Sequence, residues 1–147
     1  ALSQRFPLHL ITHQPSRRLH SQLDQSTYSR AGKIRGREPC RIHPDDALAL
    51  GIGDGDLVRL FNDRGSCISA ALLDEGLRPT GAWHDPDWDN DPDCCKHGNP
   101  NTLTRDFPTS SLASGPSALS CLVNIERLTG EAPDVTIHQP PAIAKIP

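Results

Sequence analysis

Hydrophobic and polar residues alternate most regularly in the middle of the chain, between residues 43 and 73. Val58 and Leu60 occupy every second position of a β-rich run, which predicts a strand with one buried face. The Asn-Asp-Arg-Gly sequence at residues 62–65 predicts a tight turn into a second strand that ends near Leu73. The pattern therefore predicts a β-hairpin.

A short helix is predicted directly before this hairpin. Pro44 suits the first helical position, and Asp45 and Asp46 carry negative charge where a helix N-terminus favours it. Gly51 is placed to end the helix, and residues 53–55 supply the turn into the hairpin. We expect a unit of helix, turn and hairpin.

Three more strands are predicted, in residues 7–12, 35–43 and 120–128. Residues 7–12 form a short apolar run, residues 35–43 lead into the helix, and residues 120–128 alternate between apolar and polar positions. Polar segments without an apolar period predict loops in residues 13–25 and 80–108. The chain therefore alternates short strands with long connections.

The composition agrees with a β protein. The chain has 147 residues, 4% aromatic residues, no Met, 14 Pro and 11 Gly, which favours a turn-rich β architecture over a helix bundle. We expect one domain in residues 1–131 and a proline-rich C-terminal tail without regular structure in residues 132–147.

Charge and hydropathy indicate which classes of partner the chain is expected to bind. The net charge of −3 gives no broad attraction to nucleic acid or to an anionic membrane, so we expect neither partner. There is no apolar run near 18 residues and no charged-then-apolar leader. The start at Ala1 without Met suggests a processed chain or an excised fragment, and we favour the fragment.

The cysteines are odd in number and irregularly spaced, which favours a reducing compartment over a disulfide framework. They are Cys40, Cys67, Cys94, Cys95 and Cys121. Cys94, Cys95 and His97 form the best metal-binding pattern, but adjacent cysteines rarely reach one tetrahedral ion. The alternating acids in residues 85–93 lack the closing glutamate of an EF-hand and are interpreted as a hydrated loop. We therefore predict no metal site.

Three polar segments could bind a ligand. Arg17, Arg18 and His20 could hold phosphate or a polar heterocycle, or form a solvated basic loop. Asn101 could hydrogen-bond a purine or pterin, or simply form a turn. The small side chains of residues 109–115 would let a ligand approach the backbone, although an ordinary polar turn fits equally well. Residues 110–115 are interpreted as a turn or the start of a helix. No nucleophile elbow or phosphate-binding glycine loop is present, so we predict no catalytic residue.

Three segments, taken together and in order, carry a family resemblance. They are HQPSRRLHSQLD, GREPCRIHPDDALALGIGDGDLVRLFNDRG and HGNPNTLTRDFPTSSLASGPSALSCLVNIE. This combination resembles the C-terminal domain of the molybdopterin-dependent reductases of dimethyl sulfoxide, trimethylamine N-oxide and biotin sulfoxide. HGNPN followed by LTRD is most similar to the biotin-sulfoxide branch.

The resemblance implies a mainly β fold, a closed six-stranded double-psi β-barrel with one or two short helices. It also implies that the domain binds bis-molybdopterin guanine dinucleotide, with the molybdenum ligated by residues outside this chain. The implied cofactor-binding residues are Thr12, His13, Gln14, Arg18, Leu19, His20, Ser21, Gln22, Asn101 and Ser114. Arg18 and His20 would lie near pterin or phosphate oxygens.

The family has a further short strand where this chain runs from Arg78-Pro79 directly into residues 80–83. A closed barrel needs all of its strands, so this departure counts against full closure of the barrel.

The resemblance therefore implies a fragment of a molybdenum oxidoreductase that removes oxygen from an S-oxide or N-oxide. Its partners would be the cofactor and the remaining domains of the enzyme, and the fragment alone would be inactive. The alternative is a free-standing double-psi barrel that acts as an interaction or substrate-recognition module. The free thiols favour the cytoplasm, with the periplasm as the alternative.

Overall fold

The structure, a computed structural model, describes residues 1–19, 22–77, 81–84, 100–105, 107–112, 115 and 120–136. The strands are β1 (Leu8–Ile11), β2 (Pro39–Ile42), β3 (Leu57–Phe61), β4 (Ser66–Leu73), β5 (Gly81–His84) and β6 (Ser120–Arg127). The helical elements are α1 (Leu2–Arg5), α2 (Thr27–Arg30), α3 (Pro44–Ala49) and the 3-10 turn η1 (Pro100–Leu103). The predicted β class with a few short helices is confirmed in these residues.

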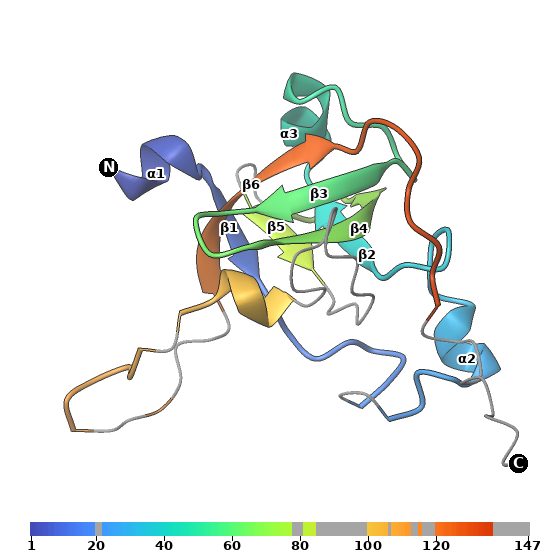
Figure 1. Ribbon diagram of the computed structural model, residues 1–147, viewed down its shortest axis with the longest axis horizontal. Coiled ribbons are helices and arrows are strands. Elements are labelled where there is room, and N and C mark those ends of the chain that lie inside the picture. The colour runs from blue at the N-terminus through green and yellow to red at the C-terminus, as the bar shows by residue number, and fades with distance from the viewer. Residues whose placement is uncertain are drawn as a thin grey trace, which may run out of the picture.

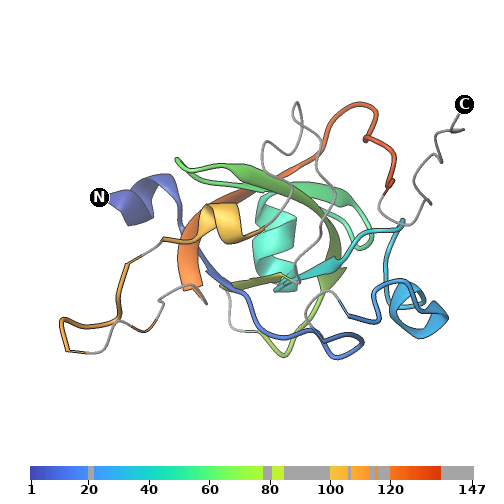
Figure 2. The same cartoon turned by 60° about the horizontal axis from the view of Figure 1, so that its bottom comes forward.

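The strands pair in the order β1-β5-β2-β4-β3-β6, and β6 pairs back onto β1. The pairs β1–β5 and β2–β4 are parallel, and the other pairs are antiparallel. Parallel neighbours need long connections, which accounts for the long segments outside the strands. Figure 1 shows α3 at one end of the sheet, and Figures 1 and 2 show η1 and the segment that follows β1 at the opposite end.

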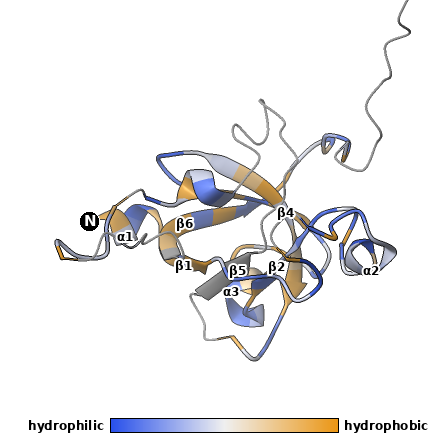
Figure 3. Cartoon of the chain, turned by 90° about the horizontal axis from the view of Figure 1, so that it is seen from below, coloured by the Kyte–Doolittle hydropathy of each residue, from blue (hydrophilic) through white to orange (hydrophobic). Residues whose placement is uncertain are grey.

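The hydrophobic core lies inside this ring of strands. In β3, Val58 and Leu60 are buried whereas their neighbours are only partly buried, as the alternation predicts. The matching buried residues of the other strands include Leu8, Leu10, Cys40, Ile42, Ile68, Val123 and Ile125. Figure 3 shows the hydrophobic positions concentrated on the strands.

The predicted unit of helix, turn and hairpin is confirmed. Pro44 is the first residue of α3, and the His43 Nδ1 atom accepts a hydrogen bond of 3.1 Å from the backbone N–H of Asp45. Gly51 follows the helix with a φ of 67°, a left-handed conformation that suits glycine. The Asn62 N–H closes the hairpin turn onto the Gly65 carbonyl at 3.0 Å.

The prediction of an unbroken loop over residues 80–108 is wrong. Residues 81–84 form β5, which pairs with β1 on one side and β2 on the other, and residues 100–103 form η1. The sequence of β5 begins with Gly and Ala, which are depleted in strands, so pairing with two neighbours decides its conformation. The strands predicted in residues 7–12, 35–43 and 120–128 correspond to β1, β2 and β6.

The α1 and α2 helices were not predicted, and residues 107–112 contain no helix. Four features of the sequence lie outside the described residues. They are the departure at residues 78–80, the acidic residues 85–93, the Cys94, Cys95 and His97 group, and residues 137–147.

Candidate cofactor-binding site

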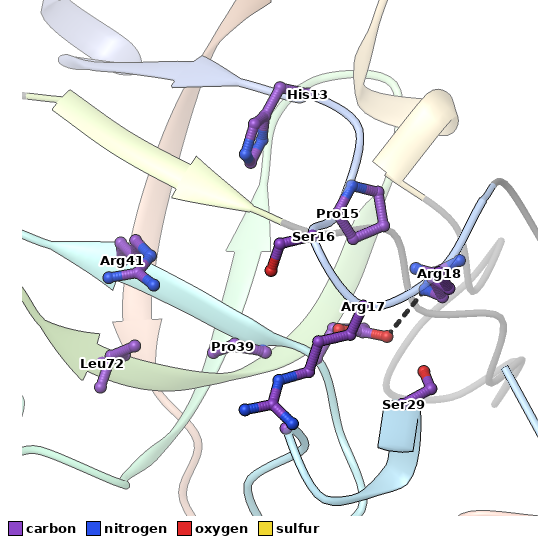
Figure 4. A pocket seen from close by; sticks show the side chains of 11 residues that line it. His13, Pro15, Ser16, Arg17, Arg18, Ser29, Pro39, Arg41 and Leu72 are labelled. Carbon is purple, nitrogen blue, oxygen red and sulfur yellow. Dashed lines mark hydrogen bonds and ion pairs between the residues drawn. The ribbon is translucent and has the colours of Figure 1, made fainter. Parts of the chain in front are cut away.

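A cavity of about 250 Å³ lies between the segment that follows β1 and the outer face of β2. The segment contributes residues 13 and 15–18, and β2 with the residue before it contributes residues 38, 39 and 41. Ser29 and Gly32, at and after α2, complete one wall, and Leu72 of β4 completes another. Figure 4 shows His13 and Arg41 along one side of the cavity and Arg17 and Arg18 along another, with Ser16 between them.

The wall formed by Arg41 carries an ion pair. The Arg41 guanidinium donates to the Asp74 carboxylate at 2.8 Å, and a hydrogen bond from the Gly76 N–H, together with this contact, lowers the pKa of Asp74. Burial and the charge of Arg41 lower the pKa of His13 from its ordinary value. His13 is therefore predominantly neutral at pH 7 and can both donate and accept hydrogen bonds.

Arg17 is positioned by α2. Its guanidinium lies 5.0 Å from the centre of the Tyr28 ring and donates to the Tyr28 carbonyl at 3.1 Å. A Cβ atom at Gly32 would lie 2.4 Å from the Arg17 Cδ atom. Gly32 therefore leaves the space in which the Arg17 side chain crosses the cavity wall.

Arg18 belongs to a buried cluster of four charged side chains, Arg18, Asp24, Lys33 and Glu38. The Arg18 Nε atom lies 2.9 Å from Glu38 Oε1 and 3.5 Å from Asp24 Oδ1. Lys33 Nζ lies 2.7 Å from the same Glu38 oxygen and 3.1 Å from the same Asp24 oxygen. We call this group the ion cluster. Its two positive and two negative charges balance, so each buried charge has partners of the opposite sign.

Hydrogen bonding within the ion cluster also acts on Lys33. Burial by itself would lower the pKa of Lys33, but hydrogen bonds and charges from Glu38 and Asp24 outweigh it and raise that pKa. Lys33 is therefore cationic throughout the physiological pH range.

The other predicted site residues lie around the same segment. Thr12 is buried directly after β1, and the Gln14 Nε2 atom donates to the Arg18 carbonyl at 2.9 Å. Leu19 and Gln22 exchange backbone hydrogen bonds, the Gln22 N–H donating at 2.8 Å and the Leu19 N–H at 3.2 Å. These two bonds pair Leu19 with Gln22 as an isolated antiparallel bridge.

Asn101 does not line the cavity. It lies in η1, which is at the same end of the sheet as the segment after β1 (Figures 1 and 2). His20, Ser21 and Ser114 lie outside the described residues. The structure thus gathers His13 and Arg18 at one cavity, with Thr12, Gln14, Leu19 and Gln22 in the segment that forms it.

Sequence reasoning missed Arg41 and Glu38 as cavity residues. Cys40 and Ile42 are buried on the inner face of β2, so the strand alternation already places Arg41 on the outer face. This alternation could have shown that Arg41 faces away from the core. It could not have shown which loop covers Arg41. Glu38 contacts Lys33, five residues away in sequence, and Arg18, 20 residues away, and no local pattern indicates the pair with Arg18.

Comparison with known proteins gives the family. Residues 8–122 match the family described as "Molydopterin dinucleotide binding domain". The chain is 46% identical over 148 residues to a trimethylamine-N-oxide reductase of Salmonella typhi, covering 95% of this chain and 17% of that protein. It is 47% identical over 133 residues to a biotin sulfoxide reductase of Cereibacter sphaeroides, covering 86% of this chain and 18% of that protein.

A solved structure of acetylene hydratase from Pelobacter acetylenicus shares the fold. Its TM-score is 0.68 at 15% identity, and the match covers 86% of this chain and 19% of that one. Because the family match extends over most of the sequence, the chain belongs to the molybdopterin dinucleotide-binding domain family. It spans less than a fifth of the length of the trimethylamine-N-oxide and biotin sulfoxide reductases that it matches.

The residues around the cavity fit part of such a cofactor. Arg17 and Arg41 supply guanidinium groups, His13 an imidazole and Ser16 a hydroxyl, a donor set that suits an anionic or polar ligand. The volume of about 250 Å³ is smaller than the pockets of roughly 300–1,000 Å³ that enclose drug-sized ligands. The cavity therefore suits one polar group of a dinucleotide and not the whole cofactor.

The described residues contain neither a metal site nor a membrane-spanning helix. No group of three or more His, Cys, Asp or Glu side chains there is arranged to hold a metal ion. Within the same residues, no helix has the length and apolar character needed to cross a membrane.

Proposed function

We propose that this chain is the cofactor-binding C-terminal part of a molybdenum oxidoreductase that reduces an S-oxide or N-oxide. The observation that carries the proposal is the family match over residues 8–122, which includes every residue that lines the cavity. The high identity to a trimethylamine-N-oxide reductase and to a biotin sulfoxide reductase supports this substrate class. The two identities are nearly equal, so either oxide is a candidate.

Each part of the proposed site has a role in binding. We propose that Arg17, Arg41 and His13 receive an anionic group of bis-molybdopterin guanine dinucleotide, and that Gln22 and Asn101 hydrogen-bond its heterocycles. The bound cofactor supplies the redox chemistry of oxygen removal. This chain binds and orients it, and the residues that ligate the molybdenum and most of the substrate site belong to the rest of the enzyme.

The first test is the composition of the native polypeptide that contains this sequence. We expect a chain several times longer than 147 residues that carries molybdenum and releases about two GMP per metal on acid hydrolysis. A native chain near this length without molybdenum or nucleotide would contradict the proposal and favour a free-standing barrel. Cysteine-bound metal other than molybdenum would instead favour the group of Cys94, Cys95 and His97.

A second test separates the site from the family assignment. We expect Gln22→Ala and Asn101→Ala, made in the native polypeptide, to lower molybdenum content, because each removes a proposed hydrogen bond to the cofactor. Leu48→Ala is the matched control, since Leu48 lies on an exposed part of α3 at the opposite end of the sheet (Figure 1). Unchanged molybdenum content in both site variants would reject these two residues.

We also propose three finer features. The two parallel pairs β1–β5 and β2–β4, joined by an antiparallel pair, support a double-psi barrel. We assign residues 1–131 to the domain and 132–147 to the tail, since β6 ends at Arg127. The free thiols of Cys40, Cys67 and Cys121 support a cytoplasmic location, which fractionation would distinguish from a periplasmic one.

A further inference from the structure

Two buried polar groups that line the cavity lack a hydrogen-bond partner within the described residues. Glu38 Oε1 accepts from Arg18 and Lys33, whereas Glu38 Oε2 has no partner there. The hydrogen bonds of Ser29 within the same residues use its backbone and leave its hydroxyl unpaired. The Glu38 side chain is 8% exposed and Ser29 is 3% exposed. Because buried polar groups are nearly always hydrogen-bonded, these two indicate a ligand that supplies donors.

Both groups lie on the side of the cavity formed by Arg17 and Arg18. Figure 4 shows Ser29 on that side, and its dashed line marks the contact between Arg18 and Glu38. The backbone of Glu38 is bound to the sheet, since its carbonyl accepts from the Ala70 N–H at 3.3 Å. Ser29 is part of α2. The fold therefore fixes the two acceptors before a ligand arrives.

Arg17 brings hydrogen-bond donors to the same side. Its guanidinium donates to the Tyr28 carbonyl and makes no ion pair within the described residues. A guanidinium has five N–H groups, so others remain for a ligand. A ligand on this side of the cavity thus meets acceptors at Glu38 and Ser29 and donors at Arg17.

Apolar surfaces lie beside these polar groups. Pro15 and Pro39 line the cavity with their rings, and Leu72 adds an aliphatic side chain. A planar ring with polar groups on its edge can pack against such surfaces, whereas a phosphate has no apolar face. A phosphate placed on this side would also bring its negative oxygens toward the Glu38 carboxylate.

We infer that this side of the cavity recognises the polar edge that guanine and pterin rings share, an amino group and a ring N–H beside a carbonyl oxygen. Glu38 Oε2 and the Ser29 hydroxyl accept from the N–H groups, and Arg17 donates to the oxygen. The inference rests on the proposed function, because it names the part of the cofactor that meets this side of the cavity. Arg41 and His13, on the other side, remain for an anionic group.

The test measures ligand binding by isothermal titration calorimetry to the native polypeptide after its cofactor has been removed. GMP and hydroxymethylpterin are the two probes, and the one that binds identifies the ring that the cavity receives. If the ring is guanine, IMP, which lacks the amino group, should bind at least about tenfold more weakly than GMP. Binding of neither probe would leave water as the partner of Glu38 and overturn the inference.

Glu38→Gln assigns the binding to this cavity, because an amide N–H takes the place of an acceptor oxygen. XMP has an oxygen where GMP has the amino group. The variant should therefore bind GMP more weakly, and XMP at least about tenfold more tightly than the wild-type protein does. For a pterin, lumazine is the matching analogue. Damage to the ion cluster alone cannot produce such a gain, so a loss of GMP binding without a gain of XMP binding would overturn the inference.

Ser29→Ala tests the second acceptor without changing the ion cluster. The variant keeps the backbone N–H that donates to the Ser26 hydroxyl, so the start of α2 is preserved. It should weaken the binding of GMP or of the pterin by about threefold to tenfold. Unchanged affinity for the probe that binds would contradict the role of Ser29 and the two-acceptor recognition inferred here.

Inorganic phosphate is the competing probe. A cavity that binds only an anion would take up phosphate, and Glu38→Gln would tighten that binding because it removes a negative charge. That result, without a preference for the amino-bearing ring, would overturn the inference.

Glu126→Gln is the matched control, because it breaks an ion pair of the same 2.9 Å length between Arg59 of β3 and Glu126 of β6. It should leave the binding of every probe unchanged. Native wild-type protein without molybdenum or GMP would reject the proposed function itself. Native protein with both, and a Glu38→Gln variant that shows no exchange of preference, would reject only the present inference.

Discussion

At the scale of single residues, charge determines how the cavity behaves. His13 and Arg41 share one wall, and a positive charge beside an imidazole disfavours a second proton. The interaction is modest in water and grows as solvent is excluded. An anionic group bound there would reverse the effect, since it favours the protonated imidazole.

Replacing Arg41 by Met should raise the pKa of His13 toward its ordinary value, although not fully, because burial also lowers it. Titration of the His13 ring by NMR measures this directly. Between the lowered pKa of His13 and its ordinary value of 6.5, this group binds fewer protons in the folded state than in the unfolded state, so its contribution makes the free energy of unfolding rise with pH in that window. Arg59→Met, on a different strand, should leave the titration of His13 unchanged.

Leu23 offers a second test at this scale. Leu23→Gly should raise the free energy of unfolding by about 0.5–1 kcal/mol, because relief of roughly 1–2 kcal/mol of left-handed strain exceeds the entropy that glycine adds to the unfolded chain. Urea denaturation of cofactor-free protein measures the change. Gln25→Gly, two residues on at an exposed position without a left-handed φ, is the control and should destabilise. A lower free energy of unfolding in both variants would mean that Leu23 carries no strain.

At the scale of elements, the strands depend on the residues that face the interior. β3 contributes Val58 and Leu60, which are fully buried, and shares hydrogen bonds with β4 and β6 on its two sides. α3 is short and contributes Ala47 to the core. Most of the apolar burial that stabilises the fold therefore comes from the sheet.

Leu60→Ala should lower the free energy of unfolding by about 2–5 kcal/mol, the usual range for a fully buried leucine. Leu48→Ala in α3 is the matched control, because this leucine is 81% exposed, and it should change stability by less than about 0.5 kcal/mol. Chemical denaturation of both variants provides the comparison. Similar losses would mean that the inner face of β3 is not part of the core.

At the scale of the whole molecule, the segment after β6 returns to the region that precedes β2. Arg37 is 2% exposed, and its Nη2 atom donates to the Pro133 carbonyl at 2.7 Å. The Val135 side chain lies against Gly36, where a Cβ atom would be 3.2 Å away. The chain beyond β6 thus packs beside the turn that leads to Glu38.

Truncation after Glu131 should lower the free energy of unfolding by about 1–3 kcal/mol, because it removes the carbonyl that Arg37 bonds in a buried place. Truncation after Thr136 keeps Pro133 and Val135 and serves as the control. Thermal or urea unfolding of the native polypeptide with each truncation measures the difference. An equal decrease in the free energy of unfolding in both truncations would show that the Pro133 contact does not stabilise the fold.

The candidate site was predicted in part. The segment after β1 was identified because basic and amide side chains gather within a few consecutive residues, a local feature of the sequence. Arg18 was predicted to face the cofactor, whereas its Nε atom bonds Glu38, so direct contact with the cofactor stays a prediction. Arg41 is part of the site only because folding brings β2 beside the segment after β1.

The sequence by itself determined the elements whose causes are local. Proline and acids at the start of α3, the glycine after it and the alternation in β3 act within a few residues, and they specified helix and hairpin. Only the tertiary structure decided that Gly81–His84 is a strand, that β1 lies beside β5, and that Arg18, Asp24, Lys33 and Glu38 come together. Those outcomes depend on pairing and on charge balance between residues far apart in the chain, which no local pattern encodes.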